Sequence, residues 1–244
     1  MLQATTASAN PAVDISGNSD ISNSSVKGEN KGAGAAVKQS GTTTMMSAGV
    51  TGTAASGSGV EVGGAVTLDE SSAKGLKAGS TDGSGLVLKE GADVSVVQDG
   101  TATPVTTAVV LEGTSDSGNA VTVDGNAAIS GVILKGVTAS ESGAGVALKN
   151  GRLELSDNLA GVEAGSSGMG TALLMENAGL DGKGYRESGM GDYVLRPEVS
   201  GDGIGFHALG DNQLRSVVVE ALSRGKGSAL KVEDGTLSSD KGIT

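Results

Sequence analysis

The chain has 244 residues, of which 42 are Gly, 3 are Pro and none is Cys or Trp, and its formal net charge is −11. Aromatic residues make up only 1% of it, too few for the usual globular core, in which Phe, Tyr and Trp supply much of the volume. The single His and the lack of Cys exclude most zinc, iron–sulfur and thiol sites, and the negative charge argues against an extended phosphate-binding surface. A hydrophobic fraction of 37% nevertheless predicts a folded chain if the aliphatic residues are patterned.

Short blocks in which small residues lead into an apolar–x–apolar motif recur along the chain. The first apolar residues of these blocks are the anchors Val13, Val37, Val60, Leu86, Val121, Val146, Leu173, Phe206 and Leu230. Successive anchors lie 24, 23, 26, 35, 25, 27, 33 and 24 residues apart. A period of this length predicts one repeat architecture, so we treat residues 1–244 as a single segment rather than as separate domains.

Two weaker apolar series share the period. One consists of Val26, Val50, Leu76, Leu111, Val137, Val162 and Leu222, and the other of Ile21, Met45, Leu68, Val94, Ile129 and Leu214. Each period therefore carries three short strands separated by Gly, Ser, Thr, Asn and Asp. Gly interrupts every helical pattern, and the one candidate helix, residues 215–224, contains three consecutive Val residues that favour a strand.

Three short strands per period predict an all-β fold, a right-handed parallel β-helix (β-solenoid) of about nine coils of about 24 residues. Aliphatic residues at equivalent positions would form inward ladders, and Gly and Asn would form the corners. The turns that carry acidic residues, Asp69–Glu70, Lys89–Glu90 and Glu233–Asp234, are expected to be solvated corners.

Three parts of the chain depart from the regular coil. Residues 1–12 are expected to be frayed or to form a partial coil, and residues 98–109 and 176–200 are expected to be inserted side loops. Residues 1–12 have neither the basic nor the apolar region of a signal peptide, and no apolar run approaches the length of a membrane span. We also expect that the chain is a piece of a longer solenoid.

The second insertion and the residues after it hold most of the unusual chemistry. We take as candidate ligand-binding residues Tyr185, Arg186, Tyr193, Arg196, Phe206 and His207. Tyr and Arg are enriched at contact hot spots, which predicts a recognition patch, although the aromatic residues can instead cover an apolar rung. His207 has no nucleophile signature nearby, so we expect no catalytic residue, no metal site and no cofactor.

The coils, such as SGSGVEVGGAVTLDESSAKGLKAGSTDGSGLVLKEGADVSV (56–96), resemble the repeats of filamentous-haemagglutinin-type exoproteins over residues 12–175 and 200–244. The subgroup they suggest is the contact-dependent growth-inhibition effector (CdiA type). The resemblance implies a protein secreted by the two-partner route to the cell surface of a Gram-negative bacterium.

For this segment the resemblance implies a non-catalytic role, binding a receptor on a target cell to allow toxin delivery. The expected partners are an outer-membrane protein or a lipopolysaccharide or other glycan, together with adjacent coils of the full-length exoprotein. Neither nucleic-acid binding nor membrane insertion is expected. Two alternatives stay open: a passive stalk or general adhesin, and a β-helical enzyme that cleaves polysaccharides.

Overall fold

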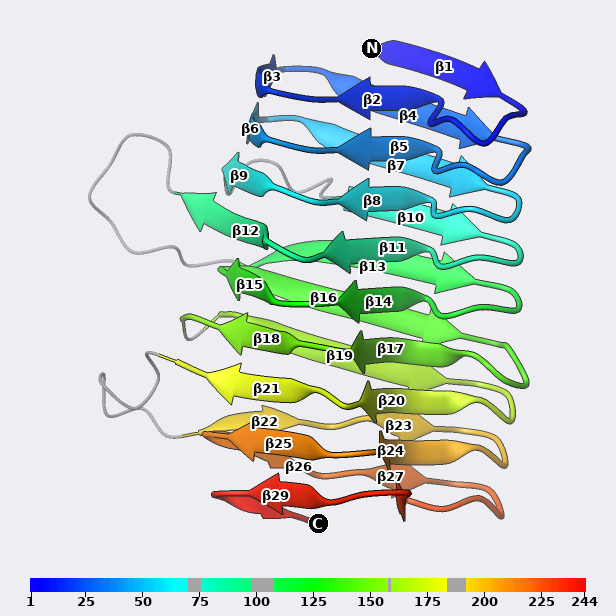
Figure 1. Cartoon of the computed structure of the whole chain (residues 1–244), viewed down its shortest axis with the longest axis vertical. Helices are drawn as coiled ribbons and strands as arrows, with labels where there is room; N and C mark the ends of the chain where they lie inside the picture. Colours follow the sequence, from blue (N-terminus) through cyan, green and yellow to red (C-terminus); the bar gives the residue numbers. More distant parts are fainter. Residues whose placement is uncertain (70–75, 98–107, 158, 184–191) are drawn as a thin grey trace.

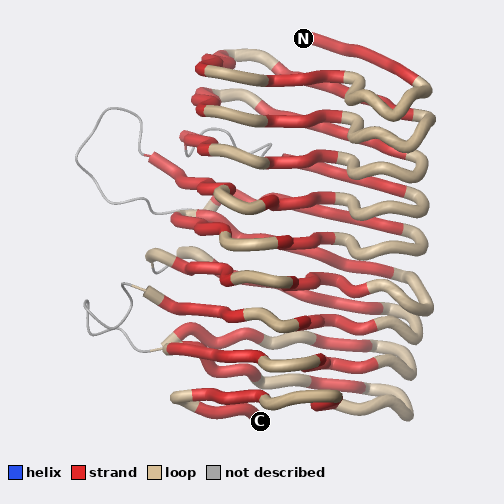
Figure 2. The backbone as a smooth tube through the Cα atoms, in the orientation of Figure 1, coloured by secondary structure: helices blue, strands red, loops and turns tan. Residues whose placement is uncertain are grey.

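The computed structural model describes residues 1–69, 76–97, 108–157, 159–183 and 192–244. These residues form a rod of stacked β coils and contain no helix (Figure 1, Figure 2). Within each main sheet a strand pairs in parallel with the equivalent strand of the next coil, so neighbours in the sheet are distant in the chain. The prediction of an all-β parallel solenoid is therefore confirmed.

Three sheets of nine strands form the sides of the rod. Sheet A contains β1 (Leu2–Thr6), β4 (Ser25–Asn30), β7 (Gly49–Ala54), β10 (Leu76–Ser80), β13 (Val109–Ser115), β16 (Val132–Thr138), β19 (Gly161–Ser166), β23 (Glu198–Val199) and β27 (Leu222–Ser223). Sheet B contains β2 (Val13–Ile15), β5 (Val37–Gln39), β8 (Val60–Val62), β11 (Leu86–Lys89), β14 (Val121–Asp124), β17 (Ala144–Lys149), β20 (Thr171–Glu176), β24 (Ile204–Leu209) and β28 (Leu230–Glu233). Sheet C contains β3 (Asn18–Ser22), β6 (Thr42–Met46), β9 (Ala65–Asp69), β12 (Ala92–Val97), β15 (Ala127–Ser130), β18 (Arg152–Leu155), β21 (Gly179–Gly182), β25 (Asn212–Arg215) and β29 (Leu237–Ser239).

The coil is right-handed. In Figure 1 the strands of sheet B run from right to left in front, those of sheet A run from left to right behind them, and the chain descends from its N-terminus. This is the hand that connections between parallel strands take in nearly all proteins.

The nine anchors form one continuous column in sheet B. Each anchor pairs with the next, from Val13 on Val37 to Phe206 on Leu230. The first eight anchors are at most 6% exposed, and Leu230 of the last coil is 41% exposed. The anchors are therefore the inward ladder that the period predicts, and they form the centre of the aliphatic core.

The other two apolar series contain errors of register. In sheet A the column passes from Leu111 to Leu134, because side chains alternate along β16 and Val137 points outward with 46% exposure. In sheet C, Val94 pairs with Val66 rather than Leu68. A shift of two residues keeps the same face of a strand inside, so the apolar pattern alone does not detect it.

One Gly of each coil after the first lies at the corner between sheets A and B, against the backbone of the preceding coil. A Cβ on Gly57 would lie 2.1 Å from the carbonyl oxygen of Gly34, and a Cβ on Gly83 would lie 2.3 Å from that of Gly57. Ser80 supports this corner, since its hydroxyl donates to the Gly57 carbonyl (2.7 Å) and accepts from the Gly83 N–H (2.9 Å). Close stacking of backbone thus explains why Gly is so abundant.

The insertion predicted over 176–200 is shorter than expected, because β21 continues sheet C and β23 rejoins sheet A. A small fourth sheet, D, lies between them in the last coils and contains β22 (Tyr193–Leu195), β26 (Val217–Val219) and β30 (Gly242–Ile243). Pro197, which has no N–H to donate to a neighbouring strand, lies between β22 and β23. The favoured strand within 215–224 is confirmed as β26. Residues 98–107 and 184–191, the centres of the two predicted loops, lie outside the described residues.

Two other local predictions have different outcomes. Residues 2–6 form β1, which pairs with β4 over five residues, so the start of the chain enters the rod as a partial coil. The prediction of a solvated corner is wrong for Asp69, which is 2% exposed and accepts a hydrogen bond from the Ser47 N–H at 3.0 Å. Glu90, by contrast, is exposed. Its carboxylate accepts a hydrogen bond from the backbone N–H of Asn126, and this bond lowers the pKa of Glu90.

Candidate functional site

The structure places two of the predicted site residues in the core. Phe206 is 0% exposed and lies between Leu173 and Leu230 in the anchor column. Tyr193 is 6% exposed, and its hydroxyl donates to the backbone carbonyl oxygens of Asp157 and Lys183. These aromatic residues cover the core, so we leave both out of the proposed contact surface.

The remaining predicted residues do not form one patch. Arg196 is exposed beside sheet D, with its Nε 2.7 Å from Glu220 Oε2. His207 lies on the outer face of sheet B, with its Nε2 3.0 Å from Glu233 Oε2. Tyr185 and Arg186 lie outside the described residues. The described members are thus spread over different sides of the rod.

A trough on the outer face of sheet C is the candidate site. It consists of two adjoining hollows of about 390 Å³ and 430 Å³ that share Asn126 and Arg152. The first is lined by Gly91, Ala92, Asp93, Asn126, Ala127, Ala128, Arg152 and Glu154. The second is lined by Asn126, Gly151, Arg152, Asn177, Ala178, Gly179, Asp211, Asn212, Gln213, Thr236 and Ser238. The trough therefore crosses several coils along the rod.

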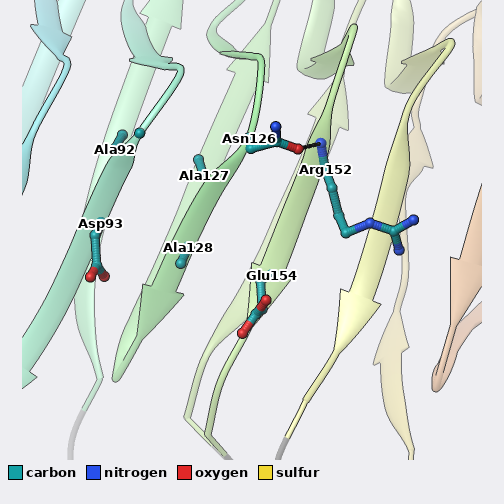
Figure 3. Close-up of a pocket in the computed structure, with 8 residues that line it drawn as sticks. Ala92, Asp93, Asn126, Ala127, Ala128, Arg152 and Glu154 are labelled. Carbon is teal, nitrogen blue, oxygen red and sulfur yellow. Dashed lines mark hydrogen bonds between the residues drawn. The ribbon is translucent and has the colours of Figure 1, made fainter.

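Small residues make the trough hollow. Asp93, Ala128 and Glu154 are successive members of one column across β12, β15 and β18. Figure 3 shows the two carboxylates on either side of the short Ala128 side chain. Because strands in a sheet are ~4.8 Å apart, the two carboxylates are separated by about two strand spacings. The space above Ala128 is therefore bordered by acidic groups on both sides.

Arg152 is the central side chain of the trough. Its Nη1 donates to Asp181 Oδ2 and its Nη2 donates to Gln213 Oε1, both at 3.1 Å. The guanidinium lies over Gly179, where an added Cβ would be 3.1 Å from Arg152 Cζ. The backbone N–H of Arg152 donates to Asn126 Oδ1 at 3.1 Å (Figure 3). Residues of the two following coils thus hold one planar cation at the surface, and Asn126 of the preceding coil holds the backbone of Arg152.

Two carboxylates at the trough have cationic partners. Asp181, 9% exposed, has Arg152 as its partner, and Glu154 forms an ion pair with Lys183. Within the described residues no group of three or more His, Asp or Glu side chains is placed to hold a metal ion. The trough offers amide and guanidinium donors beside carboxylate acceptors, a set suited to binding a polar ligand through directional hydrogen bonds.

The extra residues of the chain follow strands of sheet C. The segments 70–75, 98–107 and 184–191 follow β9, β12 and β21 in the chain, and all three strands belong to sheet C. Two of these segments lie in the longest periods of the repeat. Variation in coil length is therefore concentrated after the strands of sheet C. Insertions of this kind are where repeat proteins commonly place binding residues.

Sequence reasoning missed the trough because its residues are far apart in the chain. Asn126, Arg152, Asn177 and Gln213 belong to four coils, and none lies in a recognisable motif. A signal does exist, since Asn126, Arg152, Gly179 and Gln213 are spaced by about one coil. To recognise from the sequence that these residues lie side by side, one needs the exact register of sheet C.

Comparison of the chain with protein-family models, curated proteins and solved structures gives no match. Across the described ranges, no helix has the length and apolar character needed to cross a membrane. The coil pattern and the geometry of sheet C are therefore the features that bear on function.

Proposed function

We propose that the chain is a non-catalytic recognition segment of a large secreted bacterial exoprotein of the filamentous-haemagglutinin type. In this proposal it binds an outer-membrane protein or glycan on a neighbouring cell and allows toxin delivery in contact-dependent growth inhibition. The observation that carries the proposal is the trough of sheet C. Its lining includes residues of β12 and β21, the two strands that are followed in the chain by the extra residues of the longest coils.

The chemistry of the trough supports recognition by hydrogen bonding. The guanidinium of Arg152 is held in place by Asp181 and Gln213, so little further ordering is needed when a ligand binds. Its planar fork can bind paired oxygen atoms of a receptor loop or a sugar. The acidic residues around it, with the net charge of −11, disfavour a strongly anionic partner.

Binding of the purified chain to Gram-negative cells, with a panel of strains that each lack one outer-membrane receptor, tests the proposal. We expect binding to disappear in one strain.

Replacing 184–191 or 98–107 with a Gly-Ser linker of equal length, or changing Asn126 and Gln213 together to Ala, should weaken binding at least tenfold. A matched control changes Lys38 and Glu61 on sheet B to Ala. Equal binding by all variants would favour the passive stalk or general adhesin.

The enzyme alternative has one specific observation in its favour. Asp93 and Glu154 flank a hollow on the same face as Arg152, and glycosidases use two carboxylates on either side of the scissile bond. Incubation with bacterial surface polysaccharides tests it. Cleavage that is lost in both Asp93→Asn and Glu154→Gln would replace the binding proposal, whereas we expect no cleavage by the unaltered chain.

A further inference from the structure

The trough of sheet C runs along the rod. Its lining residues belong to six neighbouring strands, β12, β15, β18, β21, β25 and β29, or to the turns just before them. Because neighbouring strands are ~4.8 Å apart, the five spacings from β12 to β29 give a length of about 24 Å. A ligand that occupies both hollows is therefore an extended chain that crosses the strands.

The main chain beneath the trough is already paired. The strands β15, β18, β21 and β25 each pair in parallel with a neighbour on both sides. An extended peptide commonly binds by adding a strand to a free sheet edge, where main-chain hydrogen bonds supply the affinity. The trough lies on the face of the sheet and offers side chains instead, so it does not suit recognition of a peptide main chain.

The trough also lacks the side chains that anchor a protein partner. None of its lining residues is aromatic, and none is an aliphatic residue larger than Ala. Protein interfaces depend on a few buried anchors, chiefly Trp, Tyr and Arg. Arg152 is of this type, but Asp181 and Gln213 already hold its guanidinium. A protein loop would therefore find few strong contacts here.

The first hollow suits the ring of a sugar. Ala127 and Ala128 lie between the carboxylates of Asp93 and Glu154 (Figure 3). A sugar ring carries C–H groups on its faces and hydroxyl groups around its edge. The small apolar residues can cover such a face, and an ionised carboxylate accepts strong hydrogen bonds from hydroxyl groups. Apolar and acidic groups are thus arranged as a sugar requires.

The second hollow supplies hydrogen-bond donors. Asn177 Oδ1 accepts a hydrogen bond from the Asp211 N–H at 3.2 Å, and Gln213 Oε1 accepts one from Arg152 at 3.1 Å. Within the described residues, the amide nitrogens Asn177 Nδ2 and Gln213 Nε2 donate to no partner. An amide nitrogen offers two donors. Both side chains can therefore donate to the hydroxyl oxygens of a ligand.

The charges of the trough favour a neutral ligand. Asp181 and Glu154 are paired with Arg152 and Lys183. The net charge of −11 repels an anionic chain. A polycationic chain would lie against the guanidinium of Arg152 in the middle of the trough. An extended, uncharged molecule rich in hydroxyl groups avoids both penalties.

We propose that the trough of sheet C binds a neutral glycan that lies along the axis of the rod. The inference rests on the recognition role proposed above and names the class of its ligand. Sugar rings contact the small residues of the first hollow, and their hydroxyl groups bond to Asp93, Asn177 and Gln213.

Outer-membrane vesicles from Gram-negative strains, measured with the full chain, test the class of ligand. One sample is treated with proteinase, which removes exposed protein, and another with periodate, which cleaves the vicinal diols of sugars. We expect binding to survive proteinase and to weaken at least tenfold after periodate. Binding should change less than about twofold between low and high salt, because a neutral ligand forms no ion pairs for salt to screen.

Variants test the location of the site. Ala128→Leu fills the space between Asp93 and Glu154 and should weaken vesicle binding at least tenfold, and Asn177→Ala should weaken it at least threefold. The matched control is Thr44→Leu, on the outer face of the same sheet, two strands before β12 and outside both hollows. It should bind like the intact chain. Circular dichroism shows whether each variant remains folded.

Binding that proteinase abolishes and periodate spares would overturn the glycan and leave the recognition role in place. Equal binding by Ala128→Leu and Thr44→Leu, both folded, would overturn the assignment to the trough. Binding that falls steeply with salt would overturn the neutral class. Failure to bind untreated vesicles of any strain would overturn the recognition role, and this inference with it.

Discussion

The Cβ that an alanine would add at Gly143 would lie 2.0 Å from the carbonyl oxygen of Gly118 in the preceding coil. The same relationship joins Gly118 to Gly83 (2.4 Å) and Gly170 to Gly143 (2.3 Å). Real Cβ atoms do not approach backbone oxygen this closely, so the corner between sheets A and B has no room for a side chain. The spacing of the coils, ~4.8 Å, thus depends on this column of glycines.

Replacing Gly143 with Ala should therefore destabilise the protein by about 1–3 kcal/mol, the range for side chains forced into packed structure. The matched control is Gly161→Ala, where the nearest described atom beyond the adjoining residues is Ile133 Cγ1, 3.9 Å from the added Cβ. The control should stay within about 0.5 kcal/mol of the unaltered protein. Chemical denaturation measures both, and equal stability of the two variants would contradict the close-contact explanation.

Phe206 provides a second test, because it is the largest fully buried side chain and fills the anchor column near the C-terminal end. Phe206→Ala should cost about 3–5 kcal/mol, and Phe206→Leu should cost less than about 1.5 kcal/mol because it keeps most of the volume. Hydrogen exchange should show the loss mainly in β20, β24 and β28, since each coil contacts only its neighbours. Leu222→Ala, at a side chain that is 42% exposed, is the control. A uniform rise in exchange along the rod would contradict the nearest-neighbour picture.

The sequence allowed the coil to be predicted because each period repeats an inward apolar residue at one position of sheet B. The anchor column from Val13 to Leu230 needed no information beyond that spacing. Register within the other two sheets was harder. Leu134 and Val137 are both aliphatic and three residues apart, and only the pairing with Leu111 shows which one faces inward.

The candidate site was the part that the sequence predicted least well. Clustering of rare residues drew attention to Tyr193 and Phe206, but scarcity of aromatic residues does not distinguish a core position from a surface one. Arg152 and Gln213 are 61 residues apart in the chain and join only because two coils of unequal length bring them together. Asp69 was misjudged for a related reason: the N–H of Ser47 that accommodates its carboxylate comes from the preceding coil.

Acid should loosen the C-terminal coils. The hydrogen bond from Lys231 and, secondarily, that from His207 lower the pKa of Glu233, and the hydrogen bond from Arg224 lowers that of Glu198. A carboxyl group with a lowered pKa in the folded state stabilises the protein above its ordinary pKa and loses this effect as the pH falls through the lowered value. Both groups connect the last coil to the one before it.

Hydrogen exchange of β27 and β28 should therefore accelerate as the pH falls below about 4, the ordinary range of a glutamate side chain. Exchange data must be corrected for the intrinsic effect of pH on amide exchange. Glu233→Gln should already show faster exchange of β28 at neutral pH and a smaller further change in acid. If β17 in the middle of the rod loosens before β28, the assignment of acid sensitivity to these two carboxylates is wrong.

The ion pair between Arg152 and Asp181 should be energetically coupled, because Asp181 is 9% exposed and loses its charged partner when Arg152 is shortened. Arg152→Ala should cost about 1–3 kcal/mol, mainly as the penalty of a poorly hydrated carboxylate without its hydrogen bond. Asp181→Asn should recover part of this loss when it is combined with Arg152→Ala.

A double-mutant cycle on unfolding free energies should give a coupling of about 1 kcal/mol, since the Arg152 side chain is 32% exposed and water weakens the attraction. The pair Lys77–Glu112 on sheet A, at 3.6 Å and with side chains 62% and 36% exposed, is the control and should show a smaller coupling. A coupling no larger than that of Lys77–Glu112 would mean that the trough does not hold Arg152 in a fixed position, and its role in recognition would lose its physical basis.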